Sequence, residues 1–127
     1  MQDKHLFEYA VVRIVPRVER EEFLNVGVIV FCKKLKFLQC RFHIDHSRLA
    51  ALSKELDVEA LKGYLAGFEN ICAGKKEGGP IARLEVPERF RWLTATRSTI
   101  VQVSKVHPGF CANMEEAADK LFHQLVL

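Results

Sequence analysis

A charged turn near the start of the chain carries the residues best suited to bind an anion. The turn follows Pro16 and precedes a long apolar segment. Its charged residues, and the two polar or small residues after them, are Arg17, Glu19, Arg20, Glu21, Glu22, Asn25 and Gly27. On a functional interpretation, Arg20 contacts an anionic group and Glu22 orients Arg20. On a structural interpretation, Arg20 and Glu22 clamp the turn, Asn25 bonds local backbone and Gly27 marks a bulge.

A second polar cluster lies between residues 89 and 99. It holds three arginines, one tryptophan and several hydroxyls, namely Arg89, Arg91, Trp92, Thr94, Thr96, Arg97, Ser98 and Thr99. Arginine forks and hydroxyls suit a phosphate or carboxylate, and Trp beside Arg can stack on a base. The alternative is a buried Trp92 with arginines that face solvent or pair with Glu85 and Glu88. If the strand after this cluster pairs with the first strand, Arg97 approaches Arg13 or Arg20.

Other reactive residues give no recognisable motif. His43 and His46 flank Asp45, but the spacing is poor for a metal, because residues 43 and 45 share one face of a strand and residue 46 does not. The chain lacks the nucleophile, phosphate-loop and zinc-protease signatures. The four cysteines have no C-x-x-C spacing and lie in apolar surroundings, which favours reduced thiols. The sequence predicts no catalytic residue, no metal site and no cofactor.

Composition indicates one domain spanning residues 1–127. Hydrophobic residues make up 49% of the chain, enough for a core, and the net charge of +3 is too small for a dedicated nucleic-acid binder. No apolar run reaches the roughly 18 residues of a membrane span. The N-terminus shows no signal-peptide pattern. We therefore expect a cytoplasmic protein that does not contact membranes.

Hydrophobic periodicity predicts an α+β fold: an antiparallel sheet of about four strands, with helices packed mainly on one face. The expected strands are Phe7 to Val15, Leu24 to Cys32, Phe37 to Ile44 and Thr99 to Val106, with a turn at His107-Pro-Gly109. Helices are expected after Asp45 or Ser47, from Asp57 to Gly74, from Pro87 to Leu93 and after Asn113. Gly63 and Gly67 interrupt the second helix, which predicts close packing against the sheet.

Two separated blocks resemble one bacterial family. The first is Tyr9…Val12-Arg13-x-x-Pro16…Arg20-x-Glu22-Phe-x-Asn25-Val-Gly27-Val. The second is Arg89-Phe-Arg91-Trp92-Leu-Thr-Ala-x-Arg97-Ser98-Thr99-Ile with His107-Pro-Gly109. They resemble the DUF3037 family, whose name records no activity. The resemblance implies an accessory role, because we expect members to be encoded beside HipA-like kinases.

These observations lead to three functional hypotheses. The first is a non-enzymatic interaction or accessory module for a HipA-like kinase, which binds through Arg13, Arg20, Glu22, Asn25, Arg97 and Ser98. The second is an enzyme of unassigned chemistry that acts on a phosphorylated or nucleotide-like small molecule through the same arginines. The third, which the balanced charge disfavours, is a weak nucleic-acid binder. A homodimer is one way to cover the edges of the sheet.

Overall fold

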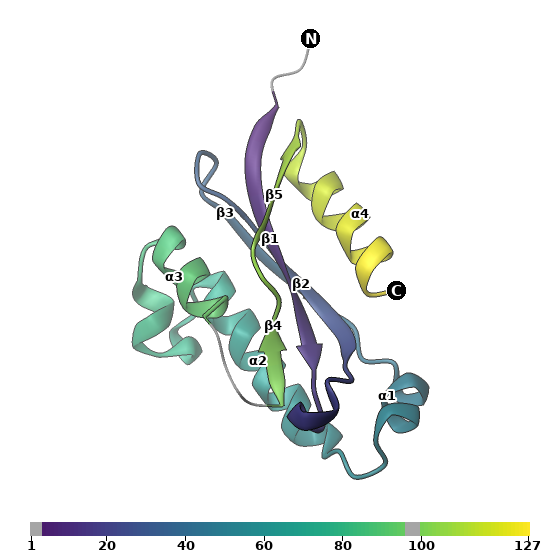
Figure 1. Cartoon of the computed structure of the whole chain (residues 1–127). Helices are drawn as coiled ribbons and strands as arrows, with labels where there is room; N and C mark the ends of the chain where they lie inside the picture. The colour runs from purple at the N-terminus through teal and green to yellow at the C-terminus, as the bar shows by residue number, and fades with distance from the viewer. Residues whose placement is uncertain (1–3, 96–99) are drawn as a thin grey trace.

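The computed structural model describes residues 4–95 and 100–127 and contains one five-stranded antiparallel sheet. The strands are β1 (His5–Ile14), β2 (Leu24–Cys32), β3 (Phe37–Phe42), β4 (Val101–Val103) and β5 (His107–Cys111). Their order is β3-β2-β1-β4, and β5 also pairs with β1. Figure 1 shows β5 and β4 following one another along the same side of β1. The α+β class and the antiparallel sheet are confirmed, with one strand more than the sequence predicts.

The central strand β2 is almost entirely buried, as its continuous apolar run predicts. Its register against β1 shifts between Val12 and Arg13, so one extra residue of β2 bulges out there. Gly27 lies at this shift, where a Cβ atom would overlap the Phe42 ring and come within 2.7 Å of the Arg41 carbonyl oxygen. Glycine is therefore required by the close approach of β3, and the bulge that the sequence predicts at Gly27 lies one residue earlier, at Val26, which has no counterpart on β1.

The sequence predicts a turn at His107-Pro-Gly109. The structure shows instead that this segment is the first part of strand β5. It pairs with β1 through Phe7 opposite Gly109 and Tyr9 opposite His107. Pro108 is tolerated because β5 lies at the edge of the sheet, where one missing amide costs no ladder hydrogen bond. Gly109 leaves room for the Phe7 ring, whose Cζ would lie 2.5 Å from an added Cβ. Pro and Gly thus serve an edge strand here.

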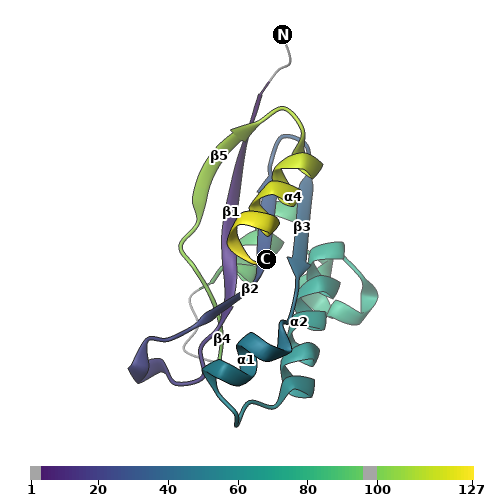
Figure 2. The ribbon, with the colours of Figure 1, turned by 90° about the vertical axis from the view of Figure 1, so that its right-hand side faces the viewer.

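Helices lie on both faces of the sheet, which the sequence does not predict. Helices α2 (Val58–Ala73) and α3 (Val86–Leu93) cover one face, and α4 (Met114–Leu125) covers the other. Figure 1 shows α2 and α3 to the left of the sheet and α4 to its right, and Figure 2 shows α4 running in front of the strands. Helix α1 (His46–Leu52) lies at one end of the sheet.

Two hydrophobic cores follow from this layering. The α2 and α3 side contains, among others, Ile29 and Phe31 of β2, and the Phe31 ring stacks on Phe90 of α3. The α4 side takes the alternate β2 residues Val28, Val30 and Cys32. Arg41 of β3, expected on a half-exposed face, lies on this second side and bonds Glu115 and Asp119 of α4. Both faces of β2 are covered because both sets of alternating residues are apolar.

The helix ends match the capping residues in the sequence. Asp45, Asp57 and Asn113 accept the amides of Arg48, Ala60 and Glu116. Gly74 ends α2 with a positive φ of 70°. Outside residues 1–3 and 96–99, three short 3-10 helices connect the larger elements: η1 (Val18–Arg20), η2 (Lys76–Gly78) and η3 (Pro80–Arg83). Within the described residues, no helix combines the length and the apolar character needed to cross a membrane.

Gly63 and Gly67 do not pack against the sheet, contrary to the sequence prediction. A Cβ atom added at either position would meet nothing within 4 Å. Both glycines lie on the outer side of α2, whose sheet-facing residues are Leu61, Leu65, Phe68 and Cys72. Each costs the helix about 1 kcal/mol relative to alanine. No contact within the described chain offsets that cost.

Candidate functional site

The charged turn after Pro16 forms the single helical turn η1 and places Arg20 beside Glu22. The Arg20 Nε donates to Glu22 Oε1, and the Arg17 Nε lies 3.6 Å from Glu19 Oε1. Glu21 takes a left-handed conformation, with φ of 56°, which reverses the chain into β2. All four side chains of the two ion pairs are more than half exposed. The arrangement fits the predicted clamp and also presents charge to solvent.

Arg20 and Glu22 each stabilise the charged form of the other. The hydrogen bond to Glu22, and then the negative charge of Glu22, raise the pKa of Arg20 above its ordinary value. The same hydrogen bond and the positive charge of Arg20 lower the pKa of Glu22. Both groups therefore stay charged at neutral pH.

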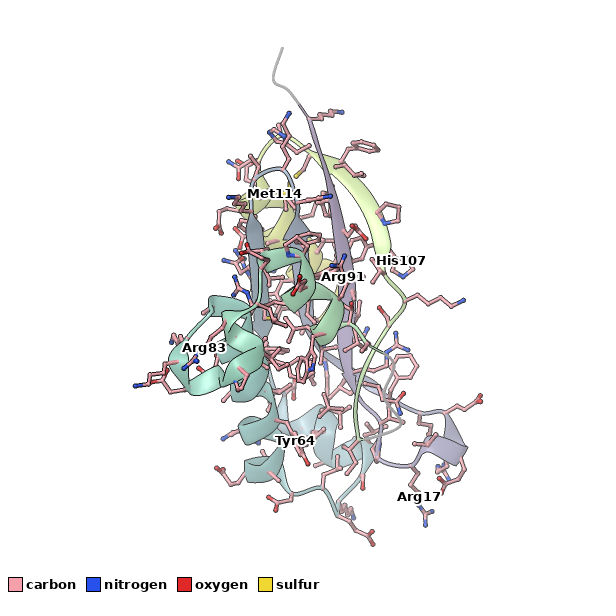
Figure 3. The ribbon with its side chains drawn as sticks, turned by 90° about the vertical axis from the view of Figure 1, so that its left-hand side faces the viewer. Arg17, Tyr64, Arg83, Arg91, His107 and Met114 are labelled. Carbon is pink, nitrogen blue, oxygen red and sulfur yellow. The ribbon has the colours of Figure 1, made fainter. Side chains whose placement is uncertain are left out.

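A polar hollow of about 410 Å³ lies between this turn and the end of α1. We call it the turn hollow. It is lined by Pro16, Arg17, Arg20, Glu22, Ala51, Leu52, Ser53, Lys54 and Glu55. Figure 3 shows Arg17 on the projecting turn, away from the body of the domain. The sequence did not predict the part played by Lys54 and Glu55, because only the fold brings residues 51–55 beside residues 16–22.

Arg13 and Asn25 lie opposite each other on β1 and β2, at the shift in register. The Arg13 guanidinium sits 4.1 Å above the centre of the Phe23 ring. The Asn25 Nδ2 donates to the carbonyl oxygen of Leu125, near the end of α4, at 3.1 Å. Neither residue lines the turn hollow. Of the four predicted site residues that the structure describes, only Arg20 and Glu22 therefore line the turn hollow.

Two buried polar atoms remain at the register shift. Within the part of the chain that the structure describes, Arg13 Nε and Asn25 Oδ1 are buried and have no hydrogen-bond partner. Arg97 and Ser98 of the predicted site lie outside the described residues. The expected neighbour relation of the late strand is confirmed, because β4 pairs with β1 and Gln102 lies opposite Arg13.

The second polar cluster divides between structural and exposed positions. Arg89 Nη1 donates to the carbonyl oxygens of Ile71 and Cys72, at 3.0 and 2.9 Å. It thereby binds two carbonyls of the last turn of α2, of which the Ile71 oxygen also accepts the Gly74 amide. Trp92 is 38% exposed and is not part of the buried core. Arg89 is thus occupied within the fold, whereas Arg91 and Trp92 remain at the surface.

An apolar groove lies where α3 meets the outer side of α2. We call it the α2–α3 groove. Its volume is about 430 Å³, and its lining residues are Ala60, Gly63, Tyr64, Gly67, Phe68, Ile71 and Trp92. Tyr64 is 64% exposed, so most of its aromatic side chain faces solvent beside the groove. The sequence signal for this surface was the pair of glycines one turn apart, which we assigned to packing on the sheet.

In the described chain, the contacts of Asp45, Cys40 and Cys111 are those of structural residues. Asp45, between the two histidines of the weighed metal motif, accepts the Arg48 amide as a helix cap. Burial and then a hydrogen bond with Cys72 raise the pKa of the Cys40 thiol well above its ordinary value. Burial likewise raises the pKa of Cys111. The described residues include no group of three or more metal-ligating side chains placed to hold an ion.

The fold and these surfaces define a small α+β domain with a helix-covered antiparallel sheet, a polar hollow beside the charged turn and an apolar groove beside α2. The chain belongs to a family described as protein of unknown function (DUF3037), whose model matches residues 9–126. The resemblance seen in the two sequence blocks is thereby confirmed. No curated protein and no solved structure matches the chain.

Proposed function

We propose that this protein is a non-enzymatic interaction module that binds an anionic group of a partner protein at the turn hollow. The observation that carries the proposal is the gathering of Arg17, Arg20 and Lys54 around one polar hollow of about 410 Å³. Two carboxylates, Glu22 and Glu55, line the same space. The lining therefore carries a net charge of +1. It can attract an anion, and it stays soluble when no anion is bound.

Arg20 can bind an anionic group of a partner while it stays bonded to Glu22. A guanidinium has five N–H donors, and the described hydrogen bond to Glu22 uses Nε. The remaining donors can bind a carboxylate or phosphate from a partner while Glu22 holds the side chain in place. Glu22 is then an orienting residue, as the sequence predicts. Arg97 and Ser98 enter this proposal from the sequence alone, and Arg13 and Asn25 do not line the hollow.

The pKa directions favour binding over acid–base catalysis. A general acid or base works best with a pKa near the operating pH. Arg20 and Glu22 are both shifted away from neutrality, so neither is suited to exchange a proton with a substrate. The charged pair is better suited to electrostatic recognition, in which each group keeps its charge throughout.

A HipA-like kinase in the bacterial cytoplasm is the first partner to test, on the strength of the family resemblance. The experiment is a pull-down of the tagged protein from its native host, followed by calorimetric titration of the purified partner. We expect Arg20→Ala with Lys54→Ala to weaken binding at least tenfold. The matched control is Lys33→Ala with Lys34→Ala, which removes the same charge from the exposed turn after β2.

Binding by the folded Arg20 and Lys54 variant that equals wild type would exclude the turn hollow as the binding site. The pair Arg20→Ala and Arg97→Ala then tests whether the predicted surface extends to residue 97. Loss of affinity in the lysine control alone would point to general charge attraction instead of a defined site. Recovery of the tagged protein with no partner would count against the accessory role.

A second candidate is an enzyme or sensor for a phosphorylated small molecule. The observation that favours it is the size of the turn hollow, since small-molecule sites span about 300–1,000 Å³. Thermal-shift screening against nucleotides and sugar phosphates tests it, and a shift abolished by Arg20→Ala would support it. The nucleic-acid hypothesis loses Arg89, which is bound to the carbonyls of α2.

A further inference from the structure

The α2–α3 groove is an open apolar surface on the outer side of the domain. It shares no lining residue with the turn hollow, so it is a separate surface and not part of the proposed anion site. Tyr64 and Trp92 stand at the groove, 64% and 38% exposed. Figure 3 labels Tyr64 on α2, below Arg91 of α3. Exposed aromatic surface of this kind is typical of an interface.

The bottom of the groove is suited to a second helix. Gly63 and Gly67 lie one helical turn apart, and an added Cβ at either position would meet nothing within 4 Å. Ala60, which is also exposed and lines the groove, continues the small side chains along the outer side of α2. Small side chains let another helix approach closely, with ridges of one helix in the grooves of the other.

We propose that the occupant of this groove is a second copy of the same chain, with the two α2 helices packed antiparallel. The first reason is self-complementarity. The large Tyr64 side chain protrudes directly beside the gap at Gly63 and Gly67 on the same helix. A two-fold axis near residue 65 places the Tyr64 of each copy over the gap of its partner, as an isologous interface requires.

The second reason is charge complementarity along α2. Residues 54–59, which lead into α2 and form its first two positions, carry three carboxylates (Glu55, Asp57 and Glu59) and one lysine. Residues 73–77, at its C-terminal end, carry Lys75 and Lys76 and one glutamate. Antiparallel packing places the acidic end of each copy beside the basic end of its partner. Parallel packing would place like charges together, which costs affinity.

The test is sedimentation velocity of the full chain over a range of concentrations, with two independent perturbations. Gly67→Leu projects a large side chain into the groove and should weaken self-association at least tenfold. It keeps the monomer folded, because nothing in the described chain lies within 4 Å of the new Cβ. The matched control, Ala50→Leu, adds a leucine at an exposed position of α1 and should leave association unchanged.

The second perturbation reverses charge at one end of α2. Lys75→Glu with Lys76→Glu should weaken antiparallel association severalfold, and more strongly at low salt than at high salt. In a parallel dimer, the substitutions would replace contacts between lysines of the two copies with contacts between glutamates. Association would then not weaken in this way. The control, Lys33→Glu with Lys34→Glu, changes net charge equally in the turn after β2 and should not weaken association.

A wild-type protein that stays monomeric up to about 1 mM, the weak end of specific association, would overturn the proposal. So would a dimer that neither Gly67→Leu nor the reversal at residues 75 and 76 weakens. Partner binding at the turn hollow is measured separately, so failure of one proposal leaves the other intact. Circular dichroism of each variant confirms that a change in association does not reflect unfolding.

Discussion

Glycine-to-alanine substitution should change stability with opposite sign at different positions of this fold. At Gly63 and Gly67 the new methyl group enters open space, so only backbone entropy and helix propensity change. We expect each substitution to raise the free energy of unfolding by about 1 kcal/mol. At Gly27 the methyl group would overlap the Phe42 ring and come within 2.7 Å of the Arg41 carbonyl oxygen.

The expected cost at Gly27 follows from where these neighbours lie. Arg41 O belongs to the backbone of β3, which is paired to β2 and cannot move without disturbing the ladder. Overpacking of this kind costs about 1–3 kcal/mol, and the backbone contact favours the upper end. For a domain of this size, 1 kcal/mol shifts the melting temperature by about 4 °C. Gly63→Ala with Gly67→Ala should therefore melt about 8 °C higher than wild type.

The assay is urea and thermal unfolding followed by circular dichroism, at low and at high protein concentration. Dilution matters because the proposed dimer would use the same glycines. At low concentration only the increase in the free energy of unfolding of the monomer should appear. At high concentration part of that increase should be lost, because the substitutions weaken association. A Gly63→Ala and Gly67→Ala variant that is less stable than wild type at high dilution would refute the placement of these glycines on an open surface.

Two further predictions concern the predicted site residues. Asn25→Asp replaces the donor to the Leu125 carbonyl with a carboxylate; it should cost about 1–3 kcal/mol near neutral pH and less in acid, where the protonated group can donate again. Equal loss at all pH values in urea unfolding would count against this contact. Arg20→Ala should raise the pKa of Glu22, now held below its ordinary value of 4.5. Because the folded pKa is depressed, the pair supports stability above the unfolded value and loses it as pH falls; an unchanged Glu22 carboxyl titration by NMR would contradict it.

The secondary structure was most predictable where one local pattern dominates. The apolar run Leu24–Cys32 predicts β2 with the bounds that the structure has. Asp57 and Gly74 mark both ends of α2, because a cap and a left-handed terminator act within one turn of the helix. Pro87, in the first turn of α3, acts in the same local way.

The failures concern features that local chemistry leaves open. Pro and Gly at 108 and 109 are typical of a turn, yet an edge strand also accepts them, and only the pairing with β1 decides. The second helical face of the sheet was missed because Arg41 and Gln39 suggested exposure. Arg41 is instead bound by two carboxylates of α4, more than 70 residues later in the chain.

The predicted site residues likewise divide into those with contacts close in sequence and those with contacts distant in sequence. Arg20 and Glu22 are two residues apart, and their pairing could be foreseen. Asn25 bonds a carbonyl 100 residues away, and Arg89 bonds carbonyls 17 and 18 residues away, so no sequence pattern signals either contact. Polar residues that satisfy distant backbone groups resemble ligand-binding residues in sequence, because the same donor groups serve both purposes.

The glycines of α2 show how a failed prediction becomes informative. A glycine inside a helix conflicts with local propensity, and such conflicts persist where another interaction compensates. At Gly74 the compensation is the helix end, and at Gly27 it is the approach of β3. At Gly63 and Gly67 the described chain offers none, while Tyr64 stands exposed beside them. The compensating contact is therefore to be sought outside the monomer, and a second copy of α2 has the shape and the charge to provide it.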